Sequence, residues 1–347
     1  MDLLLKIIYS GIHENKGGNY KIGNKKFIVN FFVVILLMFS YFFYSLNGGD
    51  IENNKEINTA DYEEQIIPWN LEILAVKKRD SIKDDYKMRI AIVDSGINKD
   101  HEDLVGTVVK EFNVINKGEQ IRDELGHGTA IAGIIAAQDN NMGIIGIAPS
   151  TEIYDVKVLD DEGKGNVDHF IEAIEWCIEE QIDMINISFG FQTDNDELKQ
   201  TIDKAISKGI IIVASAGNNY GMKTDYPAKY ENVISITSID KKLQRSNFAS
   251  RQEIDFALPG EEILTTNNDD GYSLFNGTSF ATAHATGIIA LILADYRINK
   301  LDKEMFFMDY LNFFSFKFDC WEELDYGKGL LTFKKRDEMS GFSEVCH

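Results

Sequence analysis

Three segments of the chain carry polar residues that together could activate a hydroxyl group for attack on a carbonyl carbon. Ser279 lies just before the apolar run Ala283–Leu293, so a buried helix is predicted to begin near it. A hydroxyl at a helix N-terminus lies among unpaired backbone N–H groups, which stabilise developing negative charge. Asp94 follows the apolar run Arg89–Val93, and His127 opens a run of small and apolar residues. A serine nucleophile needs a base of this kind, and the base needs a group that orients it.

Each of these residues also has an ordinary structural explanation when it is taken alone. The run Gly277-Thr278-Ser279 occurs in helix caps, an aspartate after a strand is often a cap, and a histidine at a helix start is often a surface residue. The order Asp94, His127, Ser279 is far more specific than any one of the three motifs.

The residues around these motifs predict alternating strands and helices. Apolar runs typical of buried parallel strands lie at Arg89–Val93, Glu152–Leu159, Met184–Ser188, Gly209–Ala214 and Val233–Ser238. Helical patterns lie between them at His127–Ala137, Val167–Glu180 and Asp196–Lys208. This alternation predicts an α/β fold with a mostly parallel central sheet flanked by helices on both faces. Asp94 is expected at the carboxyl end of a strand, where such sheets bind ligands.

Together the motifs resemble those of the subtilisin-family serine endopeptidases, the subtilases. The resemblance covers roughly Gln65 to Leu331 and implies a subtilisin-like fold. It implies that His127 takes the proton from Ser279 and that Asp94 holds the imidazole tautomer. Asn218, in the segment 214–219, matches the family asparagine that donates its side-chain amide to the oxyanion.

The resemblance also implies how a peptide or protein substrate binds. The substrate would add as a strand between Gly163-Lys164-Gly165 and Ser188-Phe189-Gly190. At the P1 position, on the acyl side of the cleaved bond, Asp225 would lie at the bottom of the pocket and favour Arg or Lys. The alternative is that Asp225 faces solvent in a turn.

A structural Ca²⁺ site is implied by the same resemblance. Its ligands would be the side chains of Gln65, Asp103 and Asn140 and the carbonyls of Gln138, Met142 and Ile144. About six oxygens with one carboxylate suit a hard cation. A polar turn stabilised by Asn and Gly is the alternative.

Composition limits the partners and the cross-links. The formal net charge of −21 argues against nucleic acid and anionic membrane surfaces as partners. Cys177, Cys320 and Cys346 are too few and too scattered to predict a disulfide framework, and Cys177 is expected to be a small buried apolar residue.

The N-terminal region contains a long apolar run. Phe27–Leu46 has no charged residue, follows three lysines, and at about 20 helical residues is long enough to cross a bilayer. The sequence predicts a cytoplasmic tail (1–26), a transmembrane anchor or signal segment (27–46), a linker (47–64), a peptidase domain outside the cytoplasm (65–333) and a polar tail (334–347). A cleaved signal peptide, which would give a secreted enzyme, and a buried soluble helix are the alternatives.

Two hypotheses about function follow. The first is a membrane-tethered processing endopeptidase, for example one that removes leader peptides. The second is a catalytically silent subtilase scaffold that binds peptides or regulates a partner. Two features motivate it: the linker is too short for the family's pro-domain, and Ala283 replaces the proline usual after the serine. Ala130 likewise replaces a histidine outside the triad.

Overall fold

The computed structural model describes residues 12–14, 20–22, 56–57, 65–76, 87–298, 307–339, 342 and 345–346. It contains two compact units, Met1–Asn53 and Asn54–His347. In the first, β1 (Ile12–Glu14) and β2 (Tyr20–Ile22) pair antiparallel. The predicted membrane segment Phe27–Leu46 lies outside the described residues.

The second unit is built on a seven-stranded sheet of order β10-β9-β8-β7-β4-β6-β5, in which every neighbouring pair is parallel. The strands are β4 (Arg89–Asp94), β5 (Val108–Asn113), β6 (Glu152–Lys157), β7 (Met184–Ile187), β8 (Ile211–Ser215), β9 (Ile234–Ile239) and β10 (Phe256–Pro259). This confirms the predicted parallel sheet and its five central strands. The two edge strands were not predicted, because β5 is largely solvent-exposed and β10 is short and ends in proline.

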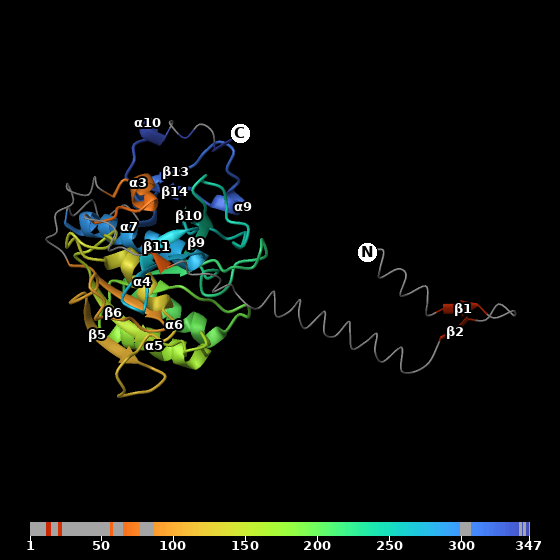
Figure 1. Cartoon of the computed structure of the whole chain (residues 1–347), viewed down its shortest axis with the longest axis horizontal. Helices are drawn as coiled ribbons and strands as arrows, with labels where there is room; N and C mark the ends of the chain where they lie inside the picture. Colours follow the sequence, from red (N-terminus) through yellow and green to blue (C-terminus); the bar gives the residue numbers. More distant parts are fainter. Residues whose placement is uncertain are drawn as a thin grey trace. The chain divides into compact units, whose positions relative to one another are not determined.

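Helices cover both faces of this sheet, as predicted (Figure 1). The first face packs on α4 (His127–Ala136) and α7 (Thr278–Ile298), and the second on α5 (Val167–Glu179) and α6 (Asp196–Ser207). Strand β4 shows the cause: Ile90 and Ile92 join the first cluster, and Ala91 and Val93 the second. Successive strand residues point to opposite faces, so a continuous apolar run is buried on both sides.

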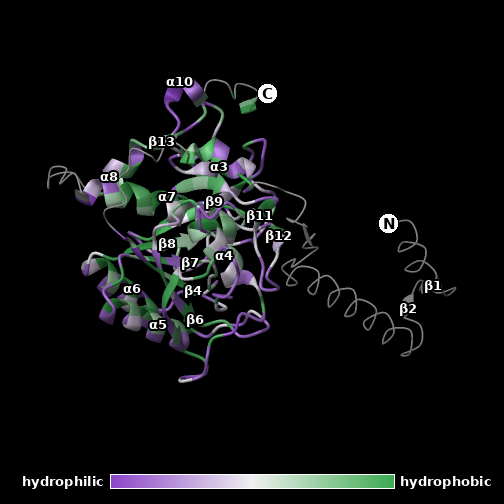
Figure 2. Cartoon of the chain, turned by 60° about the vertical axis from the view of Figure 1, so that its left-hand side comes forward, coloured by the Kyte–Doolittle hydropathy of each residue, from purple (hydrophilic) through white to green (hydrophobic). Residues whose placement is uncertain are grey.

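The helices differ in their apolar character. In Figure 2, α5 and α6 carry both hydrophilic and hydrophobic colours, as expected for helices with one solvated face. Within the described part of the chain, one helical stretch, Thr278–Arg297, is long and apolar enough to cross a membrane, and 89% of its apolar window is buried in the domain. Here it forms a core helix that supports the segment around Ser279.

Smaller elements surround the sheet. The strands β11 (Ile263–Thr266) and β12 (Tyr272–Phe275) form a hairpin, and β12 also pairs with β3 (Glu56–Ile57), which lies within the predicted linker. Near the two ends of the domain lie α3 (Trp69–Leu74), α8 (Phe307–Asn312), β13 (Ser315–Phe316), α9 (Glu323–Tyr326), β14 (Leu330–Leu331) and α10 (Arg336–Met339).

A disulfide joins Cys320 and Cys346, whereas Cys177 is free and buried. The sequence analysis expected no disulfide framework from three scattered cysteines, and it did not predict this single bridge. The C-terminal residues fold back so that the two Cα atoms lie 5.6 Å apart despite a sequence separation of 26. The spacing of the cysteines along the chain does not predict that Cys320 and Cys346 come close together.

Candidate active site

The structure brings Asp94 and His127 into direct contact. Asp94 ends β4 and is fully buried, and His127 is the first residue of α4. The imidazole Nδ1 lies 2.7 Å from Asp94 Oδ1, which also accepts a hydrogen bond from the backbone N–H of Ser95 at 2.8 Å. This pairing fixes Nδ1 as the protonated nitrogen and leaves Nε2 as the basic one.

The charges around His127 raise its pKa. Burial alone lowers the pKa of the imidazole, but the charge of Asp94, its hydrogen bond and the charge of Asp123 outweigh burial and raise it above the ordinary value. An imidazolium formed by proton transfer would therefore be stabilised, as general-base catalysis requires.

Asp123 was missed by the sequence analysis. One carboxylate oxygen accepts bonds from Ser95 Oγ and Gly126 N, both at 2.8 Å, and the other accepts from Thr129 N and Oγ1. Asp123 thus ties the loop after Asp94 to the first turn of the His127 helix. The sequence did offer a signal for Asp123. The residue before the His127 helix is Gly126, which has no side chain to cap the helix, and an acidic residue lies three positions earlier.

Another buried carboxyl, Asp155, lies on β6 beside this loop. Its Oδ2 accepts the backbone N–H of Ile97 at 3.1 Å. Burial, followed by the charges of Asp123, Glu111 and Asp94, raises the pKa of Asp155 well above its ordinary range. Through its bond to Ile97, Asp155 supports the loop that follows Asp94.

Ser279 lies in the first turn of α7 and is 8% exposed. Its Oγ donates to the carbonyl of Ser188 at 2.7 Å, and Ser188 Oγ donates to the Ser279 carbonyl at 3.3 Å. In this rotamer Ser279 and His127, both described residues, form no hydrogen bond. Catalytic bonds are often loose before substrate binds, and rotation about Cα–Cβ redirects the hydroxyl.

Asn218 follows β8 and lies beside the start of α7. Its Oδ1 accepts from both the backbone N–H and the hydroxyl of Thr278, at 3.1 and 3.0 Å. These bonds orient the amide so that Nδ2 is the group available to a developing oxyanion. Gly277, just before Thr278, has φ 153°, a backbone conformation that residues with a side chain rarely adopt.

The two predicted substrate-binding segments follow β6 and β7, the strands on either side of β4. Ser188 is buried and bonded to Ser279, and Gly190 is exposed. The segment Gly163-Lys164-Gly165 forms an exposed turn in which Asp160 N donates to the Lys164 carbonyl at 3.0 Å. Both segments therefore lie at the carboxyl edge of the sheet, on opposite sides of Asp94.

Asp225 lies against two glycines, Gly190 of the predicted substrate-binding segment and Gly217 next to Asn218. A Cβ added to Gly217 would come 2.4 Å from Asp225 Oδ2, and one added to Gly190 would come 2.7 Å from Asp225 Cβ. Burial raises the pKa of this half-buried carboxyl, and a hydrogen bond from Asn219 partly offsets the rise. The structure thus brings Asp225 next to the segment that carries Asn218.

Most of the predicted calcium ligands also converge. Gln65 Nε2 is bonded to the carbonyls of Gln138 and Ile144 at 2.7 and 2.9 Å and lies 3.4 Å from Asn140 Oδ1. Asp103 is fully buried and accepts from Asn140, Ile144 N and Tyr272. Met142 is exposed, and its N–H bonds Asn140 Oδ1.

The donor set is chemically suited to a hard cation. Three oxygens meet at the Gln65 amide, and rotating that amide would present Oε1 as a fourth. Among the described residues no cluster of three or more His, Cys, Asp or Glu could hold a metal, and the predicted set needs only one carboxylate.

The fold and this arrangement define a class: a subtilisin-like α/β domain with the apparatus of a serine protease. A family model described as the subtilase family matches residues 85–306, more than half of the chain. The chain belongs to the subtilase family of serine endopeptidases.

Curated relatives agree with this membership. Subtilisin from Bacillus pumilus is 40% identical over 214 residues, which make up 60% of this chain and 78% of that protein. Subtilisin E of Bacillus subtilis (strain 168) is also 40% identical over 214 residues, 60% of this chain and 56% of its own. Minor extracellular protease Epr of the same organism is 36% identical over 238 residues, 68% of this chain and 36% of its own.

Proposed function

We propose that the protein is a processing endopeptidase that acts outside the cytoplasm and cleaves after Arg or Lys. The observation that carries the proposal is the half-buried Asp225 carboxylate against Gly190 and Gly217, beside Asn218. A desolvated carboxylate at the end of a slot is stabilised by a cationic partner, and a basic P1 side chain supplies one.

Catalysis would use Ser279, His127 and Asp94 in their usual roles. Ser279 Oγ leaves the Ser188 carbonyl, gives its proton to His127 Nε2 and attacks the scissile carbonyl carbon. Asn218 Nδ2 and the Ser279 N–H stabilise the oxyanion. The tetrahedral intermediate collapses, the peptide C–N bond breaks, and His127 returns the proton to the leaving amine. Water, activated by His127, then hydrolyses the acyl-enzyme.

Location outside the cytoplasm is supported by two independent features. A structural disulfide such as Cys320–Cys346 persists in oxidising compartments. The uncharged run Phe27–Leu46 would anchor the chain, with the secreted form as the alternative. Tethering favours processing of defined peptides, such as leader-peptide removal, over general degradation.

A bound Ca²⁺ would be a structural part of this enzyme. Gln65, Asp103 and Asn140 would hold it through side chains, and Gln138, Met142 and Ile144 through carbonyls. The cation would supply no step of the reaction; it would join the N-terminal end of the domain to the loop after α4.

The bond from Ser279 to Ser188 favours a second candidate, a silent scaffold that binds peptides without cleaving them. Labelling with a fluorophosphonate probe separates the two. The proposed enzyme gains one adduct that is absent from Ser279→Ala, whereas a scaffold gains none.

Asp225→Ser tests the proposed specificity on unlabelled enzyme, whose active sites are counted by fluorophosphonate labelling of a separate sample. We expect kcat/KM for Arg and Lys at P1 to fall by about 10²-fold or more, with little change for Leu. Equal losses for basic and apolar substrates would mean that Asp225 supports the fold and not the pocket.

A further inference from the structure

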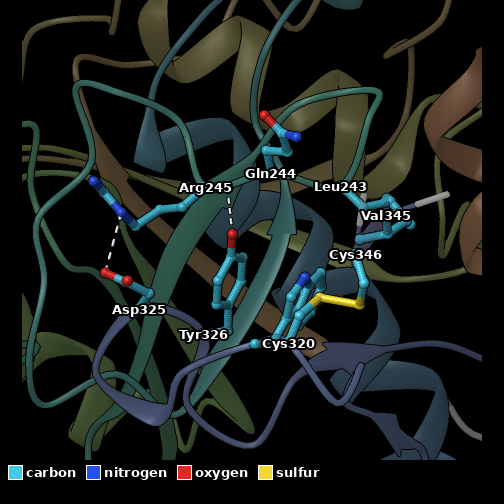
Figure 3. Close-up of a pocket in the computed structure, with 9 residues that line it drawn as sticks. Leu243, Gln244, Arg245, Cys320, Asp325, Tyr326, Val345 and Cys346 are labelled. Carbon is cyan, nitrogen blue, oxygen red and sulfur yellow. Dashed lines mark hydrogen bonds and ion pairs between the residues drawn. A yellow bond between two sulfur atoms is a disulfide. The ribbon is translucent and has the colours of Figure 1, made fainter.

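The C-terminal segment contacts a loop that borders the candidate site. In Figure 3, Cys320 is joined to Cys346, and Asp325 and Tyr326 lie beside Arg245. These residues line a cavity of about 390 Å³. The segment lies beyond residue 306, where the match to the subtilase family model ends.

Asp325 pairs with two arginines. Its Oδ2 accepts from Arg251 Nη2 at 2.9 Å, and its Oδ1 is within ion-pair distance of the Nε atoms of Arg251 and Arg245, the latter at 3.2 Å, without hydrogen-bond geometry. The Asp325 side chain is only 17% exposed. Charge pairs so shielded from water interact more strongly than surface pairs.

Both arginines hold the loop 246–252. Arg245 Nη1 donates to the carbonyls of Ser246 and Ala249, at 3.0 and 2.6 Å. The backbone N–H of Arg251 donates to Met222 O at 2.8 Å. Asp325 thus fixes side chains at both ends of this loop.

The loop in turn lies along the segment that carries Asn218. Tyr220 N donates to the Phe248 carbonyl at 2.8 Å and Gly221 N to the Ala249 carbonyl at 3.0 Å. In the opposite sense, with the loop as donor, Ser250 N donates to the carbonyl of Gly217 at 2.9 Å. The backbone on either side of Asn218 is therefore bonded to a loop whose ends Asp325 holds.

Asp325 is itself anchored by its neighbours. Trp321 is buried and stacks on Tyr326, with ring centroids 4.1 Å apart, and Tyr326 Oη accepts the N–H of Arg245 at 3.0 Å. Cys320, next to Trp321, is tied to the C-terminal residues by the disulfide. The bridge therefore restrains the segment that presents the Asp325 carboxylate.

We propose that Asp325 is a positioning residue for the substrate cleft: through Arg245 and Arg251 it holds the loop 246–252 against the segment 217–224, and the Cys320–Cys346 disulfide keeps Asp325 in place. The consequence for catalysis rests on the proposed function, because it takes Asn218 and Asp225 to be parts of the site. The mechanical claim does not depend on it.

The test compares Asp325→Asn with Glu323→Gln, which removes one charge from the same short helix outside the arginine pair. Amide hydrogen exchange of peptides covering 216–226 is the first readout, on the full chain. We expect at least tenfold faster exchange in Asp325→Asn and no change in Glu323→Gln. Equal exchange in both variants and the wild type overturns the proposal, even if the wild type proves inactive.

Kinetics form the second readout. The active-site concentration of each variant is first counted by fluorophosphonate labelling of a separate sample. Normalised to that concentration, kcat/KM on the best wild-type substrate should fall about tenfold in Asp325→Asn, which is about 1.4 kcal/mol in activation free energy. Asp325→Glu should restore part of it. A lower melting temperature with unchanged kcat/KM per labelled site indicates a merely structural role and contradicts the proposal.

The disulfide is tested with Cys320→Ser/Cys346→Ser, which also serves if Asp325→Asn does not fold. Faster amide exchange of residues 216–226 in this double variant supports the proposal. Unchanged exchange contradicts the claim that the disulfide keeps Asp325 in place. A wild-type enzyme without preference for Arg over Leu would contradict the proposed specificity while leaving these comparisons valid.

Discussion

At the scale of single residues, the Ser279 hydroxyl donates to the carbonyl of Ser188 in this structure, whereas the proposed mechanism requires it to donate to the imidazole of His127. The bond to Ser188 is a neutral one of about 0.5–1.5 kcal/mol net. Breaking it therefore adds little to a reaction barrier. Substrate in the cleft would exclude water and favour the bond to His127.

Substitutions at these residues should have unequal effects. Ser279→Ala and His127→Ala should each remove nearly all peptidase activity, and combining them should add little because the groups act as a unit. Asn218→Ala should keep a small measurable activity, since loss of the corresponding donor in a subtilisin lowers kcat by roughly 10²–10³. Steady-state kinetics check both, and full turnover by Ser279→Ala would exclude it as the nucleophile.

The raised pKa of His127 makes a prediction about pH. The base must be neutral, so kcat/KM should fall as pH drops through a value above the ordinary imidazole pKa. Asp123→Asn removes one of the charges that raise this pKa, so the acid limb should move to lower pH. A pH profile of kcat/KM for both enzymes measures the shift, and a limb that moves upward would contradict the assignment.

At the scale of elements, the five central strands and the four helices α4 to α7 were predictable because their apolar patterns follow directly from burial. The places of Asp94, His127 and Ser279 in the fold were predictable because their motifs stand at strand and helix ends, and their catalytic roles stay a prediction. The hairpin β11–β12 and the C-terminal elements were not, because short strands in mixed sequence have no clear periodicity. Asp325 was also beyond prediction, since its partners lie 74 and 80 residues away in sequence.

The proposed Ca²⁺ site would link the loop after α4 to the residues before α3, so Ca²⁺ should stabilise the folded domain. Binding to the folded state adds RT ln(1 + [L]/Kd), about 2.7 kcal/mol at a hundredfold excess over Kd. We therefore expect millimolar Ca²⁺ to raise the Tm over that in chelator, and Asp103→Asn or Gln65→Ala to abolish most of this rise. A wild-type Tm that is equal in both conditions would rule the site out.

At the scale of the whole molecule, the net charge of −21 should act on association with basic substrates. Raising NaCl from about 50 to 500 mM shortens the Debye length several-fold. We expect kcat/KM to fall several-fold for a peptide with additional basic residues and to change little for a neutral one. Equal salt dependence of the two substrates would show that long-range attraction contributes nothing.

At the same scale, the disulfide lies in the C-terminal segment that follows the match to the family model. Residues 85–306 match the subtilases, and the segment that follows ties the loop 246–252 to the C-terminus. The predicted anchor 27–46 stays a prediction, since it lies outside the described residues. Fractionation of the full chain with membranes would test it.

The central claim, cleavage after basic residues by Ser279, is tested most directly by the cleavage profile of a peptide library with every residue at P1. The account predicts that wild-type enzyme cleaves predominantly after Arg and Lys, and that Ser279→Ala cleaves nothing. A wild-type profile dominated by Phe or Leu at P1 would contradict the role of Asp225, and cleavage that survives in Ser279→Ala would contradict the catalytic assignment itself.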